Sequence, residues 1–124
     1  MNGQKTEKRK IGDLGEEIAA NFLIKKGYEI IDRNWQRKFG ELDIIAKKDN
    51  VYYFVEVKTT KGENQRFSPE DHLDDKKIRK IEMLSNIYVE SHGLEKYDNK
   101  LSAIFVYLNM ETHKAKVDFW EQIF

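Results

Sequence analysis

The stretch GELDIIAKKDNVYYFVEVKTT, residues 40–60, decides how this chain folds. Residues 41–48 and 51–58 alternate between apolar and polar side chains, as expected of half-buried strands. The Asp49-Asn50 pair between the two runs suits the tight turn of a β-hairpin. Charged residues nevertheless stand inside both runs, and the hairpin brings them onto one face.

The turn also predicts the register of the hairpin. If Asp49-Asn50 forms a symmetric tip, Asp43 lies opposite Glu56 and Glu41 lies opposite Lys58. The second pair fits a solvated face, but like charges directly opposite each other cost about 0.2–1 kcal/mol. A divalent cation shared by the two carboxylates would remove this repulsion, because Mg²⁺ prefers oxygen ligands. The pattern therefore favours a metal site over a solvated face. The core-facing residues of the hairpin are then Leu42, Ile44, Ala46, Val51, Tyr53, Val55 and Val57.

Apolar periodicity predicts the other elements of a single domain over residues 1–124. A helix is expected over residues 11–27, and a second helix begins at Ser68-Pro69 and ends near Ser91. The buried stripes are Ile11, Leu14, Ile18 and Phe22 in the first helix and Ile78, Ile81, Leu84 and Tyr88 in the second. The remaining strands are residues 28–35, an interior strand at 101–108 and its hairpin partner at 114–120, so the order α-β-β-β-α-β-β predicts an α/β domain with a mixed sheet.

Composition excludes several classes of protein. The chain is 35% charged and has no net charge, which suits an ordinary globular domain. It has no cysteine, and therefore neither a disulfide framework nor a thiolate zinc site. The basic start is not followed by an apolar segment, and no stretch is long enough to span a bilayer. We therefore expect a cytoplasmic protein without membrane contact.

The spacing of Asp43, Glu56 and Lys58, written D-x12-E-V-K, resembles the active-site signature of the PD-(D/E)XK nucleases. Over nearly the whole chain, the sequence is similar to the small bacterial YraN-type proteins of that superfamily. The archaeal Holliday-junction resolvases share its layout. The resemblance implies a restriction-endonuclease-like αβββαβ core with a mixed central sheet flanked by helices. The segments that carry it are GDLGEEIAANFLIKKGYEIIDRNW, GELDIIA, YFVEVKT and SPEDHLDDKKIRKI.

The resemblance also implies roles for individual residues. Asp43 and Glu56 would bind Mg²⁺ or Mn²⁺, and Lys58 would orient or deprotonate the attacking water. Glu16, in GDLGE, would be the helical acid that completes the metal site. A helical wheel places Glu16 on a flank with small and apolar residues, although a solvated surface acid fits the wheel equally well. Glu41 is expected to hold water beside the metal, in the second shell of the site.

The function implied is a metal-dependent endonuclease that hydrolyses DNA, including branched or flapped intermediates of repair and recombination. A non-catalytic nucleic-acid-binding module on a nuclease scaffold is the alternative. Repair or recombination proteins are the expected partners, and a homodimer is expected by analogy with small nucleases that cut paired strands. A basic cluster at residues 76–80 either grips phosphates or is simply solvated. The expected nucleic-acid contacts are Arg33, Arg37, Lys38 and Lys61, the last in place of a basic residue that YraN-type sequences often carry where Thr60 stands here.

Overall fold

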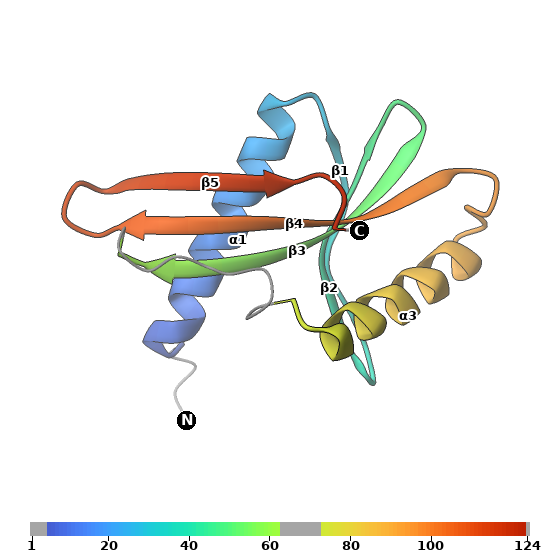
Figure 1. Ribbon diagram of the computed structural model, residues 1–124, viewed down its shortest axis with the longest axis horizontal. Helices are drawn as coiled ribbons and strands as arrows, with labels where there is room; N and C mark the ends of the chain where they lie inside the picture. The colour runs from blue at the N-terminus through green and yellow to red at the C-terminus, as the bar shows by residue number, and fades with distance from the viewer. Residues whose placement is uncertain (1–4, 63–72, 124) are drawn as a thin grey trace.

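The computed structural model describes residues 5–62 and 73–123 and confirms the predicted order of elements (Figure 1). The predicted start of the second helix at Ser68-Pro69 lies outside the described residues. No helix in the described part is long and apolar enough to cross a membrane. The elements are α1 (Glu7–Lys25), β1 (Glu29–Arg37), β2 (Gly40–Lys48), β3 (Val51–Lys61), α3 (Asp75–Ser91), β4 (Asp98–Asn109) and β5 (Lys114–Trp120).

The five strands form one mixed sheet in the order β1-β2-β3-β4-β5. β3 and β4 run parallel, and every other neighbouring pair is antiparallel. Parallel strands need a long crossover connection, and α3 belongs to the one between β3 and β4. Figure 1 shows that β1 and β2 run at a steep angle to the other three strands, so the sheet is strongly twisted. This αβββαβ layout is the predicted one and is consistent with the restriction-endonuclease-like fold.

The turn at Asp49-Asn50 sets the register between β2 and β3. Both residues have positive φ angles, 51° and 66°, as a type I′ hairpin turn requires. The paired residues run from Lys48 and Val51 at the turn to Ile44 and Val55. The predicted register is therefore confirmed over this part of the hairpin.

α1 covers one face of the sheet. Thr6 caps the helix by accepting a hydrogen bond from the backbone N–H of Arg9 (3.1 Å), so the helix begins four residues earlier than predicted. Its fully buried Ala19 and Leu23 pack in one cluster with apolar residues of β2, β3 and β4. Leu14 was expected in the buried stripe but is 47% exposed. The other three predicted residues, Ile11, Ile18 and Phe22, are partly buried against this cluster. The small residues of α1 that face the sheet allow its backbone to approach closely.

α3 covers the opposite face and is capped by Asp74, whose side chain accepts a hydrogen bond from the backbone N–H of Lys77 (2.8 Å). Its predicted stripe is confirmed, since Ile81, Leu84 and Tyr88 are buried. Tyr88 meets the buried Trp35 ring edge to face, with ring centroids 5.1 Å apart.

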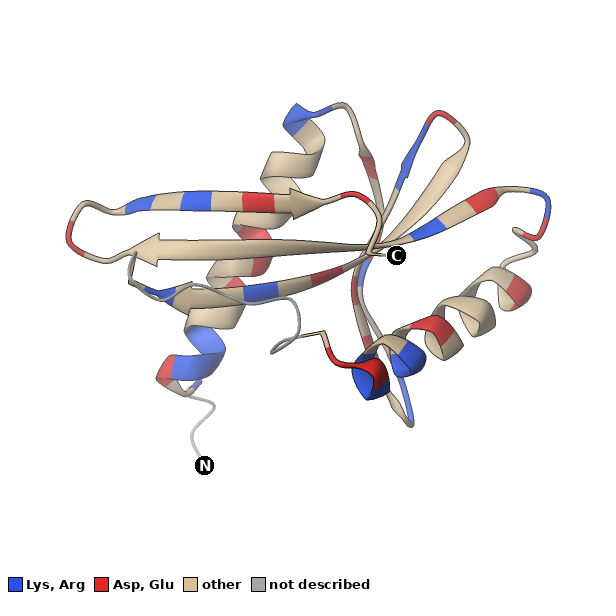
Figure 2. Cartoon of the chain, in the orientation of Figure 1, with Lys and Arg blue, Asp and Glu red and all other residues tan. Residues whose placement is uncertain are grey.

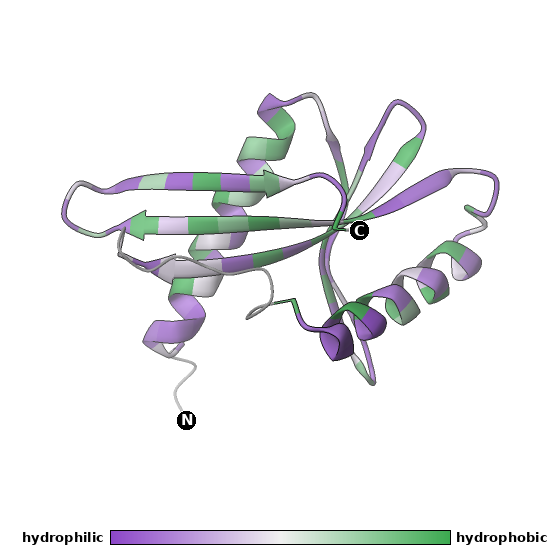
Figure 3. Ribbon diagram, in the orientation of Figure 1, coloured by the Kyte–Doolittle hydropathy of each residue, from purple (hydrophilic) through white to green (hydrophobic). Residues whose placement is uncertain are grey.

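β4 is the interior strand predicted from residues 101–108, and β5 is its hairpin partner. Figure 3 shows that β4 is hydrophilic at its beginning and mostly apolar from its middle to its arrowhead, as expected of a strand with neighbours on both sides.

The assignment of Leu42 to the face of Ile44 and Ala46 is wrong. Leu42 packs with Ile45 in the cluster beneath α3, whereas Ile44 and Ala46 lie in the cluster beneath α1. Beyond Ile44, β2 remains paired with β1 alone. The simple alternation of side chains therefore fails where the partner strand is lost.

Gly15 is required where α1 touches β3. A Cβ atom at this position would lie 1.7 Å from Oγ1 and 2.7 Å from Cβ of Thr59. Gly15→Ala should therefore destabilise the protein by about 1–3 kcal/mol, because one helix or strand must move. Gly12→Ala is the matched control on the same helix, since a Cβ there meets nothing within 4 Å. The control should gain about 0.4–1 kcal/mol, and urea denaturation of both variants measures the difference. Equal stability of the two variants would contradict close packing at Gly15.

Candidate functional site

The candidate site is a cleft that opens where β2 and β3 part. The cleft has a volume of about 820 Å³ and is lined by residues of both helices and both strands. Figure 2 shows acidic and basic residues in succession along β3 and basic residues on the first turns of α3. The residues that carry charge into this cleft are Glu7, Lys8, Glu16, Glu41, Asp43, Glu56, Lys58, Lys61, Lys77 and Lys80.

Asp43 lies at the point where the strands part. The β2–β3 ladder ends at Ile44 and Val55, and Oδ2 of Asp43 accepts the backbone N–H of Val57 at 2.9 Å. The side chain thus takes the place of a backbone acceptor. Asp43 is only 8% exposed, and burial raises its pKa to about 8, with a further contribution from the charge of Glu56. The Val57 hydrogen bond opposes the shift but does not cancel it.

Glu56 is 7% exposed and lies between two lysines. Its Oε2 is 2.8 Å from Nζ of Lys77 and 3.5 Å from Nζ of Lys58. Burial lowers the pKa of Lys58, and the neighbouring Lys77 lowers it further. Burial also disfavours the charged form of Lys77, but the Glu56 carboxylate outweighs this effect and raises the Lys77 pKa. The two amines therefore differ, and Lys77 is the one that holds its proton more tightly.

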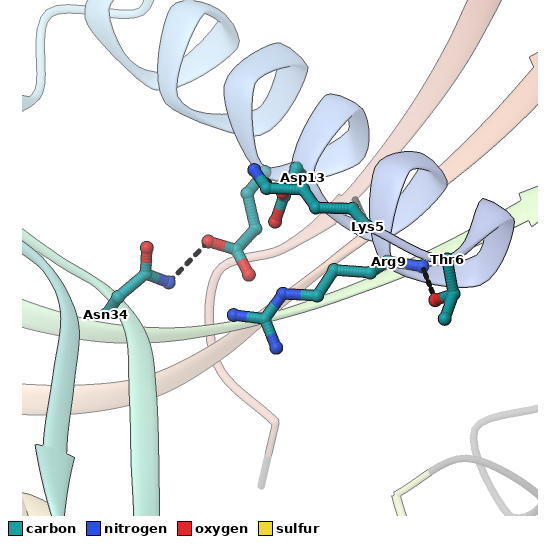
Figure 4. Close-up of polar contacts among 6 residues, drawn as sticks. Lys5, Thr6, Arg9, Asp13 and Asn34 are labelled. Atoms are coloured by element: carbon teal, nitrogen blue, oxygen red, sulfur yellow. Dashed lines mark hydrogen bonds and ion pairs between the residues drawn. The ribbon is translucent and has the colours of Figure 1, made fainter. Parts of the chain in front are cut away.

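Glu16 reaches the same site from α1. Nδ2 of Asn34 donates a 2.7 Å hydrogen bond to Oε1 of Glu16 (Figure 4). Burial raises the pKa of Glu16, the Asn34 bond opposes the shift, and the charge of Glu41 adds to it. The neighbouring Glu17 instead forms a 2.7 Å ion pair with Arg33. The inward position expected for Glu16 is therefore observed.

Three carboxylates converge in this part of the cleft. Glu16, Glu41 and Asp43 each offer an oxygen atom, and these atoms lie within 4.8 Å of one another. Three acidic oxygens at such spacing could hold a hard divalent cation, which prefers oxygen ligands. The grouping includes Glu41, which the sequence assigned to the second shell, and not Glu56, whose carboxylate is paired with lysines. The charge of Glu56 nevertheless contributes to the raised pKa of Asp43, so the two carboxylates lie close enough to affect each other.

Glu41 and Lys58 were predicted to lie opposite each other across the hairpin, and this pairing is not formed. The hairpin ladder ends before it reaches these residues, and Glu41 accepts a 3.0 Å hydrogen bond from Nε2 of Gln36 instead. Lys58 turns to Glu56, its neighbour two residues back on β3. The pairing rule failed here because it assumed that the two strands stay together.

The predicted nucleic-acid contacts divide between the cleft and the surface beside it. Lys61 lines the cleft, and its Nζ lies 3.9 Å from Oε1 of Glu7. Arg33 is paired with Glu17 outside it, and Arg37 and Lys38 belong to the end of the β1–β2 hairpin. Of these four residues, only Lys61 therefore belongs to the cleft.

Lys77 was not predicted to belong to the site. The sequence indicated only that it is part of a basic cluster at residues 76–80, which either binds phosphates or is solvated. Helical spacing could have distinguished Lys77 from the other basic residues of this cluster. Lys77 precedes the buried Ile81 and Leu84 by four and seven residues, so it lies on the same side of the helix. A lysine on the buried stripe of a helix needs an anionic partner, and Glu56 supplies it.

Residues 15–118 match the model of the uncharacterised protein family UPF0102. The chain belongs to this family. It is 40% identical to a UPF0102 protein of Caldanaerobacter subterraneus over 87% of this chain and 88% of that protein. A UPF0102 protein of Syntrophomonas wolfei is 37% identical over 89% of this chain and 93% of its own length. One from Campylobacter jejuni is 45% identical over 67% of this chain and 71% of its own length.

The UPF0102 match includes every acidic and basic residue that converges at the centre of the cleft. These residues, which all fall within residues 15–118, are Glu16, Glu41, Asp43, Glu56, Lys58 and Lys77. The exposed beginning of α1, which contributes Glu7 and Lys8 to the rim, lies before the matched range.

Asp43→Asn should stabilise the protein in the absence of divalent cations. Folded Asp43 retains its proton up to about pH 8, against an ordinary value of 3.8, so the folded state binds more protons in this range. Stability should therefore fall as pH rises from about 4 to about 8. Asparagine keeps the acceptor for Val57 and cannot ionise, so the variant should lose this slope and be more stable by about 1 kcal/mol or more at pH 8.

Thermal and urea denaturation across this pH range, with EDTA present, measures the effect. Asp118→Asn is the control, because Asp118 is an exposed residue of β5 outside the cleft. A parent protein whose stability rises between pH 5 and pH 8 relative to Asp43→Asn would contradict a raised pKa at Asp43.

Proposed function

We propose that this UPF0102 protein is a metal-dependent nuclease of the PD-(D/E)XK superfamily, which hydrolyses phosphodiester bonds in DNA. The observation that carries the proposal is the position of Asp43, a buried carboxylate at the parting of β2 and β3 with other acids and Lys58 around it. Buried acids beside a lysine in an open cleft are costly for stability and typical of functional sites. Branched or flapped repair and recombination intermediates are the substrates that the sequence resemblance favours.

The residues fit a divalent cation. Burial and neighbouring carboxylates disfavour the charged form of Asp43, and a cation would reverse both effects. Asp43, Glu16 and Glu41 would hold the ion, with Glu56 as a further oxygen donor beside Asp43. When bound, Mg²⁺ or Mn²⁺ would supply Lewis-acid activation of the phosphate and of the attacking water.

The lysines of the cleft have separate tasks in this proposal. Lys58, whose pKa is lowered by burial, is the residue suited to accept a proton from water or to orient it. Lys77 neutralises Glu56 and keeps that carboxylate in place. Lys61 at the end of β3 and Lys80 on α3 lie on different walls of the cleft and would contact successive phosphates. The expected homodimer and the repair or recombination partners remain predictions.

Cleavage is tested with linear duplex, flapped and four-way DNA, and with RNA, each in Mg²⁺, Mn²⁺ or EDTA. We expect cleavage only with metal, and a loss of at least about 100-fold in rate for Asp43→Asn and for Lys58→Gln. Lys76→Gln is the control, since Lys76 is exposed on α3 and does not line the cleft. Binding without cleavage of any substrate would favour the non-catalytic nucleic-acid-binding module instead.

Phosphate contact is tested by the salt dependence of DNA binding, measured in EDTA so that cleavage does not interfere. Lys61→Gln should weaken binding equally for different sequences and reduce the slope of log K against log salt by about 1. Lys116→Gln, on exposed β5 away from the cleft, should leave both quantities unchanged. An unchanged slope for Lys61→Gln would remove this residue from the binding surface.

A further inference from the structure

The end of the β1–β2 hairpin presents an aromatic side chain to solvent. Phe39 is 58% exposed, more than any other large apolar side chain in the described part of the chain. A single exposed apolar residue is common on protein surfaces and by itself indicates nothing. Two further features indicate a role for Phe39: its position beside the cleft and the basic residues around it.

The next residue anchors this hairpin end beside the cleft. Gly40 has a φ of 148°, which residues other than glycine rarely adopt, and it lines the cleft. A Cβ atom on Gly40 would lie 2.9 Å from Cε of Lys80 and 3.5 Å from Cδ1 of Leu84, so the hairpin end packs on α3. Figure 1 shows the hairpin extending past the first turn of α3. Phe39 is thus held at the rim rather than on a free loop.

Phe39 also lies close to the acidic site along the chain. Asp43 is four residues further on in β2, which corresponds to about 13 Å of extended strand. That distance matches about four stacked nucleotides of one DNA strand. A strand whose phosphate lay at Asp43 could therefore bring a base about four nucleotides away to Phe39.

The charges around Phe39 fit a nucleic acid. Arg37 and Lys38 precede it, and Lys80 lies beside Gly40 on the cleft side. The guanidinium of Arg37 stacks on the ring of Trp35 at 4.0 Å and donates a 2.9 Å hydrogen bond to the carbonyl of Gln36. Cations and an exposed aromatic ring within a few residues of one another are the combination that single-stranded nucleic-acid sites use, with cations for the backbone and rings for base faces.

We propose that Phe39 stacks on an unpaired base of the substrate, so that the preferred substrate is single-stranded or carries an unpaired segment beside the bond in the cleft. A base inside a duplex already stacks on its neighbours and cannot offer its face to Phe39. Stacking on an aromatic side chain is independent of base identity, so preference would follow strand structure and not sequence. This inference rests on the proposed nuclease function and narrows its substrate class.

The test compares binding of fluorescently labelled single-stranded, forked and duplex DNA in EDTA. Phe39→Ala and Phe39→Leu should each weaken single-strand and fork binding by about 10-fold and leave duplex binding unchanged. Phe39→Trp should retain tight binding, and its indole fluorescence should be quenched when single-stranded DNA is added. Met110→Ala is the control, because Met110 is 50% exposed at the β4–β5 turn and does not line the cleft.

Several results would overturn the inference. Leucine at position 39 that binds as tightly as phenylalanine would show that aromatic stacking is not involved. If Phe39→Ala weakened duplex binding as much as single-strand binding, Phe39 would not distinguish unpaired from paired DNA. A change in sedimentation of Phe39→Ala without DNA would make this residue a contact between copies of the chain. Because all binding is measured without metal, a protein that fails to cleave DNA can still show the predicted split between single and double strands.

Discussion

The hydrogen bond between Asp43 and the backbone of Val57 is the interaction on which the cleft depends. The two strands of the hairpin are paired up to Ile44 and Val55, and beyond this point a side chain carries the next contact. β2 then continues beside β1, whereas β3 continues beside β4 as far as Lys61. The strands separate without leaving the Val57 amide unsatisfied, and the space between them is the cleft.

This separation also explains how charged side chains can be buried between two strands of a small domain. No buried side-chain nitrogen or oxygen in the described residues is without a hydrogen-bond partner. Glu56 has Lys77, Glu16 has Asn34, and Asp43 has the Val57 amide. The remaining strain is electrostatic, because several carboxylates share a partly dry site. That strain is the physical reason for proposing a cation-dependent chemistry in the cleft.

The two helices position the site in different ways. α1 approaches β3 closely through Gly15 and thereby brings Glu16 to the cleft. α3 lies on the opposite face, where Lys77 and Lys80 extend from its first turns into the same space. Acids and lysines from separate elements therefore meet at one end of the sheet. The end of the β1–β2 hairpin also belongs to this region, because Gly40 lines the cleft and the exposed Phe39 directly precedes it.

The sequence by itself determined the order of elements, the tight turn at Asp49-Asn50 and the hairpin register near it, because these depend on local alternation and turn chemistry. Asp43, Glu56 and Lys58 could be identified as a group for the same reason. Only the tertiary structure decided that the strands part after Ile44, that Glu41 lies with Glu16, and that Lys77 pairs with Glu56. These contacts join residues far apart in the chain, and local patterns contain no information on how a twisted sheet and its helices bring such residues together.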